Sequence, residues 1–227
     1  SDVCSSDLKV LHVVGHGIQR QACLRRSPRP VALGLIGLGP WGRNYLRTLQ
    51  DTPGVRLRAV ASRSASAEGL PPGIRLHRDW RDLITDDAVH GVVVATPPHT
   101  HADIAIAALT AGRPVLIEKP LAADVGSARA IRAAADAAGL PVHVDHVDLV
   151  NPAWRALRRH LVAIGSIRKL RASWHAQGPI RPDTTGRWDW GAHPLAACLD
   201  VTETPPHLIA CRRLPAVQGE LIEATVR

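Results

Sequence analysis

Lys119 is one residue of this 227-residue chain whose type and position could serve proton transfer. It follows the apolar run Pro114–Ile117 and Glu118, and it precedes Pro120, so a strand would deliver it to the ligand-binding edge of a sheet. A lysine in such a place can be a surface charge, a phosphate contact or, when partly desolvated, an acid–base group.

Asp189 and His193 are the second candidate pair. They stand four residues apart, which would put a carboxylate and an imidazole on one face of a helix. Such a pair can orient and tune a general base, but surface pairs and helix caps show the same spacing. Because Pro194 disfavours helical geometry at His193, the helix can also begin later and separate the two side chains.

A glycine-rich turn directly follows the apolar run Val31–Ile36 and has the form Gly-x-Gly-x-x-Gly. In a strand–turn–helix unit, Gly37 turns the chain, Gly39 lets a pyrophosphate approach the backbone, and Gly42 lets the helix pack on the strand. The helix N-terminus then offers unpaired N–H groups to the phosphates. The turn therefore predicts dinucleotide binding.

The elements that must position these residues alternate between strand and helix. We expect strands at 31–36, 55–61, 89–95, 114–117 and 141–144, and helices from just after Gly42 to about Gln50 and at 79–84, 102–111 and 125–138. This rhythm indicates a parallel sheet with right-handed crossovers. The fold class is therefore α/β, an N-terminal Rossmann doubly wound parallel sheet followed by a partial C-terminal α+β domain with an open sheet.

The second domain is expected to open with a helix that Asn151 caps and Pro152 starts, running to Gly165. Strands at 167–175, 207–213 and 221–226 and a helix at about 195–199 should follow. We divide the chain into a leader (1–29), a Rossmann domain (30–148) and a partial C-terminal domain (149–227). Residues 1–8 resemble the translation of a sequencing adapter, so we expect the leader to lie outside the native fold.

Cofactor preference is expected to depend on Ser62, Arg63 and Ser64, which follow the second strand. An acidic residue here would bind the ribose 2′-OH of NAD, whereas Arg and Ser can hold the 2′-phosphate of NADP. The segment predicts NADP in preference to NAD. An ordinary polar loop is the alternative, since arginine is abundant throughout the chain.

Four motifs together resemble the glucose-fructose oxidoreductase and inositol dehydrogenase (Gfo/Idh/MocA) family: residues 37–42, 95–101, 111–121 and 188–193, in that order and spacing. The resemblance covers about residues 31–227. It implies an NAD(P)-dependent dehydrogenase or reductase of sugars, inositols and related compounds. It also implies a second domain whose open sheet often forms the oligomer face. Since such relatives continue beyond the end of this chain, we expect the open sheet to be incomplete.

The resemblance further implies a role for each candidate. Lys119 would contact the reacting hydroxyl and the nicotinamide, with a cis Lys119–Pro120 bond, while His193 would accept the proton and Asp189 would position the substrate or the imidazole. Arg181 would contact an anionic group of the substrate. The expected cofactor-binding residues are Gly37, Gly39, Pro40, Trp41, Gly42, Ser62, Arg63, Ser64, Thr96, Pro97, Pro98, His101, Glu118 and Lys119.

The predicted activity is hydride transfer between the nicotinamide and a secondary alcohol or ketone of a sugar, sugar acid, nucleotide sugar or cyclic polyol. The alternative is a dinucleotide-binding regulatory or scaffold protein without turnover. A third hypothesis is a basic module that interacts with polyanionic partners, because the formal net charge is +8.

Composition argues against several other classes. The basic residues are scattered, and the cluster Arg155, Arg158 and Arg159 lacks interleaved aromatics, so we expect no nucleic-acid binding. No apolar run is long enough for a membrane span, and the four unpaired-looking cysteines suit a reducing cytoplasm. His143, Asp145 and His146 would alternate faces on a strand, so we expect no metal site. The expected partners are a small-molecule substrate and further copies of the chain.

Overall fold

The computed structural model describes residues 30–64, 69–165, 167, 170, 186–202, 208–214 and 221–226. For the last two ranges, and for residues 162, 164, 186 and 187, it describes the backbone only. The predicted leader and the loop that carries Arg181 lie outside these residues, as does most of the predicted strand 167–175. Within the described part of the chain, no helix is both long and apolar enough to cross a membrane.

Six parallel strands form the main sheet, in the order β3-β2-β1-β4-β5-β6. Their bounds are β1 (Val31–Ile36), β2 (Val55–Ala61), β3 (Arg75–His77), β4 (Gly91–Val94), β5 (Val115–Glu118) and β6 (Val142–Asp145). The strand order reverses between β1 and β4, which creates the crevice where ligands of such sheets bind. The predicted doubly wound parallel sheet is confirmed.

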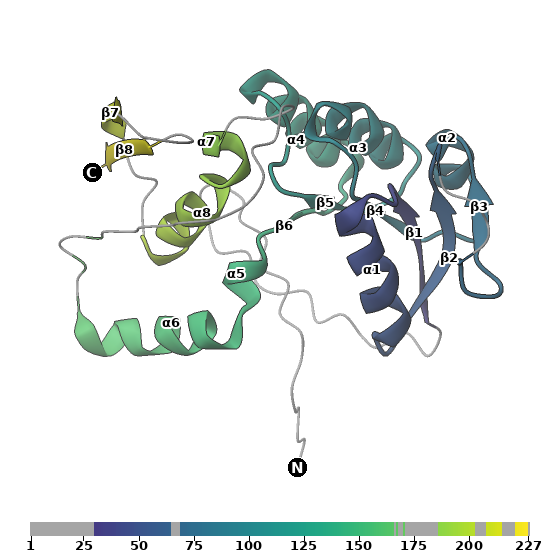
Figure 1. Ribbon diagram of the computed structural model, residues 1–227, viewed down its shortest axis with the longest axis horizontal. Coiled ribbons are helices and arrows are strands. Elements are labelled where there is room, and N and C mark those ends of the chain that lie inside the picture. The colour runs from purple at the N-terminus through teal and green to yellow at the C-terminus, as the bar shows by residue number, and fades with distance from the viewer. Residues whose placement is uncertain are drawn as a thin grey trace, which may run out of the picture.

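Helices cover both faces of this sheet (Figure 1). Helix α1 (Pro40–Asp51) lies on one face, and α2 (Trp80–Ile84), α3 (His101–Thr110) and α4 (Val125–Ala138) lie on the other. Successive strand residues point to opposite faces, so Leu35 packs toward α1 while Ile36 packs toward α3. Strands buried on both faces explain the nearly continuous apolar runs of the sequence.

Capping residues fix where the helices begin and end. The Asp124 side chain accepts a hydrogen bond from Ser127 N at 2.8 Å, and α4 ends at Gly139, which adopts a left-handed conformation with φ of 63°. Helix α6 (Pro152–Ile164) begins as predicted, since Asn151 Oδ1 accepts from Ala153 N at 2.8 Å. The short helices η1 (Pro98–Thr100) and α5 (Val147–Val150) were not expected.

The described chain continues with α7 (Gly186–Asp189), α8 (Ala192–Val201), and the antiparallel strands β7 (Leu208–Leu214) and β8 (Leu221–Val226). The two predicted strands are confirmed, and the predicted helix 195–199 is confirmed but begins earlier. Helix α5 follows β6 directly and packs against both α6 and α8. The elements α5 to α8 therefore lie beyond the β6 edge of the sheet (Figure 1).

Candidate active site

The glycine-rich turn at the end of β1 forms an open cradle. Gly37 has a φ of +101°, and a Cβ on Gly42 would lie 2.0 Å from the Gly37 carbonyl oxygen, so both positions require glycine. A Cβ on Gly39 would meet nothing within 4 Å, which leaves that backbone open to a ligand. Helix α1 starts at Pro40 with no side-chain cap, so its first N–H groups face the same opening. These residues fit a dinucleotide pyrophosphate.

Two arginines meet at the carboxyl ends of β2 and β3. Arg63 and Ser64 are exposed just after β2, and the half-buried Ser62 donates its backbone N–H to the His77 carbonyl at 3.0 Å. Arg78 Nη1 donates to the Arg63 carbonyl oxygen at 3.2 Å. Arg78 was missed at the sequence level, although its position just after β3 is the signal that could have found it.

His101 joins the loop after β4 to the loop after β5. Its ring is fully buried, with Nδ1 3.0 Å from the Pro120 carbonyl oxygen and Nε2 2.8 Å from the Thr96 carbonyl oxygen. Burial lowers the pKa of His101. Pro97 is exposed and Pro98 is buried in the same loop. The geometry gives His101 a structural part in holding two loops at the ligand edge.

Lys119 extends from the end of β5 into contact with α7. Its Nζ donates to Asp189 Oδ1 at 2.7 Å and to the Asp189 carbonyl oxygen at 3.0 Å, and both side chains are 9 % exposed. The ammonium also lies 5.5 Å from the centre of the Trp190 ring. The Lys119–Pro120 peptide bond is cis, as expected. A lysine and an aspartate that are distant in sequence thus form a buried ion pair at the sheet edge.

Asp189 and His193 do not share one helix, so of the two alternatives that the sequence left open the separated arrangement is found. Helix α7 ends at Asp189 and α8 begins at Ala192. The physical reason is Pro194, which has no N–H to donate and is tolerated in the first turn of a helix, so α8 starts just before it. Both residues are nevertheless buried, at 6 % and 9 % exposure, and the charges of Lys119 and Asp189 both act on His193.

His193 is placed between an ammonium and carboxylates. Its Nδ1 lies 3.4 Å from Asp148 Oδ2, and its ring centre lies 6.3 Å from that of Trp190. Burial and the Lys119 ammonium lower the pKa of His193, while Asp148, Asp189 and Asp145 oppose that shift. The lowered pKa favours the neutral ring, which is the form that a proton acceptor needs.

Two acidic residues, Glu118 and Asp145, lie side by side at the ends of β5 and β6, and Glu118 directly precedes Lys119 in the chain. Glu118 and Asp145 are paired across β5 and β6, and the Tyr45 hydroxyl of α1 donates to Asp145 Oδ2. Burial and the Asp145 carboxylate raise the pKa of Glu118 to about 7, against the opposing effects of Tyr45 and Lys119. Glu118 Oε2 accepts the Lys119 N–H at 3.1 Å. Glu118 therefore faces protein groups, and Tyr45 was not predicted.

His143 of the rejected metal motif is exposed, whereas Asp145 takes part in the Tyr45 cluster. The Nδ1 of His146 is buried without a hydrogen bond. Among the described residues, no group of three or more His, Cys, Asp or Glu side chains could hold a metal ion.

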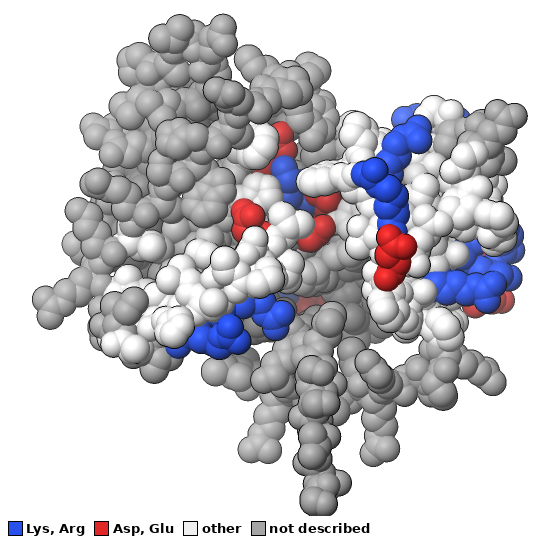
Figure 2. All heavy atoms as spheres, turned by 60° about the horizontal axis from the view of Figure 1, so that its bottom comes forward, with Lys and Arg blue, Asp and Glu red and all other residues white. Residues whose placement is uncertain are grey.

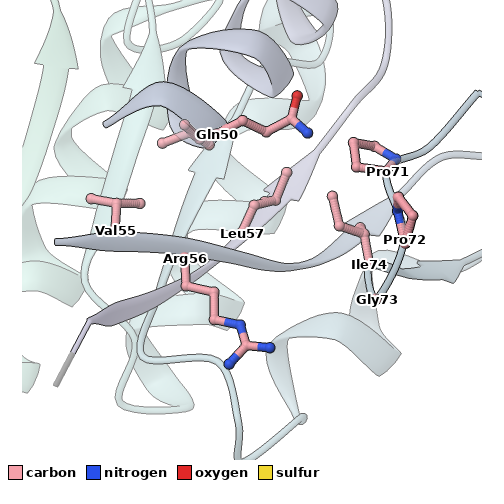
Figure 3. A pocket seen from close by; sticks show the side chains of 9 residues that line it. Gln50, Val55, Arg56, Leu57, Pro71, Pro72, Gly73 and Ile74 are labelled. Carbon is pink, nitrogen blue, oxygen red and sulfur yellow. The ribbon is translucent and has the colours of Figure 1, made fainter. Parts of the chain in front are cut away.

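Two hollows open on the described surface. One of about 360 Å³ lies next to the residue that follows Lys119, and it is lined by Pro120, Leu121, His146, Trp188, Ala192 and Leu195. Figure 2 shows acidic and basic side chains gathered between the sheet region and the helices after it. The other, about 270 Å³, lies beside the start of β2, where Arg56, Leu57 and Ile74 are among the residues that line it (Figure 3). It is at the amino ends of the strands, opposite the edge where ligands of such sheets bind.

The sheet order and the glycine cradle define a dinucleotide-binding Rossmann domain. A family model described as "Oxidoreductase family, NAD-binding Rossmann fold" matches residues 31–146, and the chain belongs to this Gfo/Idh/MocA family.

Relatives in this family are similar over part of their length. An inositol 2-dehydrogenase from Rubrobacter xylanophilus is 33 % identical over 172 residues, covering 73 % of this chain and 49 % of its own. A 4-carboxy-2-hydroxymuconate-6-semialdehyde dehydrogenase from Sphingobium sp. is 31 % identical over 135 residues, which cover 58 % of this chain and 43 % of that dehydrogenase. A crystal structure described as "a putative oxidoreductase from Magnetospirillum magnetotacticum MS-1" is 41 % identical in sequence, with a TM-score of 0.77. The match covers 87 % of this chain and 66 % of the other chain. The chain thus spans about half the length of the curated relatives it matches.

Proposed function

We propose that this chain belongs to an enzyme that transfers a hydride between a bound nicotinamide and a secondary alcohol or ketone of a sugar or cyclic polyol. The observation that carries the proposal is the buried Lys119–Asp189 ion pair, which stands next to His193 at the ligand edge of the sheet. The inositol 2-dehydrogenase relatives support the polyol class. A dinucleotide-binding scaffold without turnover would have no use for this arrangement.

In the direction of alcohol oxidation, His193 accepts the proton of the substrate hydroxyl while Lys119 donates a hydrogen bond to the same oxygen. Asp189 holds the lysine in place through its carboxylate and its carbonyl oxygen. The nicotinamide, when bound, supplies the hydride acceptor. The glycine cradle and the loops tied by His101 orient it against the substrate.

NADP is the proposed cofactor in preference to NAD. The support is the exposed position of Arg63 and Ser64 just after β2, together with the Arg78 guanidinium bound to the Arg63 carbonyl oxygen at the edge where a 2′-phosphate would lie. We further propose that the protein forms homo-oligomers through the sheet to which β7 and β8 belong.

The first test is binding of NADPH and NADH, followed by nicotinamide fluorescence. We expect NADPH to bind more tightly, and Arg63→Ala to weaken NADPH binding roughly ten-fold with NADH unchanged. Arg47→Ala, an exposed arginine of α1, is the matched control. If neither nucleotide binds to the folded chain, the proposed function is wrong. If both bind equally and Arg63→Ala affects neither, the NADP preference is wrong.

The second test is turnover of the NADP-loaded protein on a panel of inositols, sugars, uronates and nucleotide sugars. Formation of reduced nicotinamide with at least one of them is the expected result. Cofactor binding without turnover of any compound in the panel would favour the scaffold function instead.

A further inference from the structure

His193 contacts a residue that lies outside the sequence motif 188–193. Its Nδ1 is buried and makes no hydrogen bond of good geometry, yet it lies 3.4 Å from Asp148 Oδ2. Asp148 comes from α5, the short helix that follows β6, and its side chain is 40 % exposed. The contact therefore joins the end of the parallel sheet to α8.

The expected partner of the imidazole is instead engaged with the lysine. Asp189 binds Lys119 through its carboxylate at 2.7 Å and through its carbonyl oxygen at 3.0 Å. Its negative charge thus compensates the ammonium, which is 9 % exposed and needs a counter-ion. The two candidate catalytic groups consequently have two carboxylates, one for each.

We propose that Asp148 is the positioning residue of His193, accepting a hydrogen bond from Nδ1–H so that Nε2 keeps the lone pair that takes the substrate proton. This inference rests on the proposed function, in which His193 is the general base. A carboxylate on Nδ1 fixes both the tautomer and the ring orientation, and it stabilises the imidazolium that proton transfer creates. The distance of 3.4 Å is long for a hydrogen bond, and such catalytic contacts shorten when substrate binds.

Five charged or titratable groups act on His193 from the elements around it. Lys119 of the β5 end and His146 of the β6–α5 junction disfavour the imidazolium, whereas Asp148, Asp189 and Asp145 favour it. Removing the charge of Asp148 should therefore lower the pKa of His193. Because turnover in the oxidation direction requires the neutral ring, the acidic limb of the pH–rate profile should move to lower pH.

The test compares Asp148→Asn with the wild type in kcat at saturating NADP and substrate across pH. The expected result has two parts, a change in the plateau kcat and a change in the midpoint of the acidic limb. The plateau kcat falls roughly ten- to a hundred-fold, because the ring loses its orientation, while the acidic midpoint moves to lower pH. Asp148→Glu, which keeps the charge, should hold the midpoint near that of the wild type and recover part of the rate.

A purely structural role for Asp148 would lower the plateau without moving the midpoint, and that result would overturn the proposal. Unchanged plateau and midpoint would overturn it too. Asp136→Asn, which removes an exposed carboxylate of α4 that pairs with Arg132, is the matched control and should change neither quantity. If Asp148→Asn does not fold, a midpoint of Asp148→Glu moved to lower pH would decide against the proposal.

A readout independent of turnover separates this proposal from the proposed function. NMR titration of the His193 ring, assigned by its loss in His193→Gln, should give a lower pKa in Asp148→Asn than in the wild type. If no substrate is turned over but this shift occurs, the Asp148–His193 contact stands and the assigned activity fails. If the ring titrates identically in both proteins, the positioning role is refuted whatever the activity.

Discussion

The parallel sheet and the helices α7 and α8 use their buried positions in opposite ways. In the sheet and the helices on it, the most buried side chains are apolar, such as Leu35, Val93 and Leu109. In α7 and α8 the side chains described as buried are Asp189, His193 and Ala197, while Leu195 and Leu199 are 54 % and 51 % exposed.

This difference indicates that the buried residues of the sheet serve mainly stability, and the buried polar residues of α7 and α8 serve mainly catalysis. Burying an apolar side chain stabilises the fold, whereas burying a charge costs free energy unless a partner compensates it. The polar residues buried in α7 and α8 are therefore expected to serve turnover. Substitutions in the two regions should affect different measurements.

Lys119 connects the two regions, and its replacement should have the largest effect. We expect Lys119→Ala to lower kcat by roughly 10² to 10⁴-fold, because the group that polarises the substrate oxygen is lost. NADPH affinity, measured by fluorescence titration, should stay nearly constant. Since the variant leaves the Asp189 carboxylate buried without its lysine, Lys119→Ala/Asp189→Asn is the control for misfolding. Turnover within three-fold of the wild type would contradict the assignment of Lys119.

Leu109→Ala tests the apolar half of the comparison. This α3 leucine is 1 % exposed in the core between α3 and the sheet, so the substitution leaves a cavity. We expect the free energy of unfolding to fall by about 2–5 kcal/mol, measured by chemical denaturation. A loss below about 1 kcal/mol would mean that this core is not packed as described.

Glu118 is an exception within the sheet, a buried carboxyl whose pKa is raised to about 7 from a usual value of 4.5. Between these two pH values the folded protein keeps a proton that the unfolded chain releases, so stability present below pH 4.5 is lost as the pH rises to 7. The loss is on the order of 3 kcal/mol.

Denaturation of the wild type and Glu118→Gln at a series of pH values measures this contribution. The variant should lack the decline between about pH 4.5 and 7, because glutamine does not titrate. Asp103→Asn, at an exposed position of α3, controls for the general loss of a charge. Parallel curves for wild type and Glu118→Gln would show that Glu118 titrates normally.

Leu195→Ala should have the smallest effect and completes a matched pair with Leu109→Ala. The chemical change is the same and both residues are helical, but Leu195 is 54 % exposed. We expect a change in the free energy of unfolding within about 0.5 kcal/mol. A loss as large as that of Leu109→Ala would show that α8 is packed against something that the described residues do not include.

Local patterns predicted much of the fold. The apolar runs, the glycines at 37, 39 and 42, and the Asn151-Pro152 cap act through neighbours in sequence, so the sheet, the cradle and the start of α6 could be inferred directly. The residues Lys119, Asp189 and His193 were also found from sequence, through motif and resemblance, and they do lie together.

The pairing within the site could not be read from spacing. A four-residue interval suggested an Asp189–His193 dyad. In the structure a new helix begins at Ala192, just before Pro194, and Asp189 binds Lys119, 70 residues away in sequence. Asp148 and Tyr45 carry no motif, and each meets its partner only because β6, α5 and α1 converge at one edge.

Periodicity and turn chemistry are local, so the strands, the helices and the residue types at the ligand edge follow from the order of the amino acids. Which carboxylate faces Lys119 and which faces His193 depends on the three-dimensional packing. That choice depends on how separate elements pack, because a buried charge needs a compensating partner that only the packing of distant segments can bring to it.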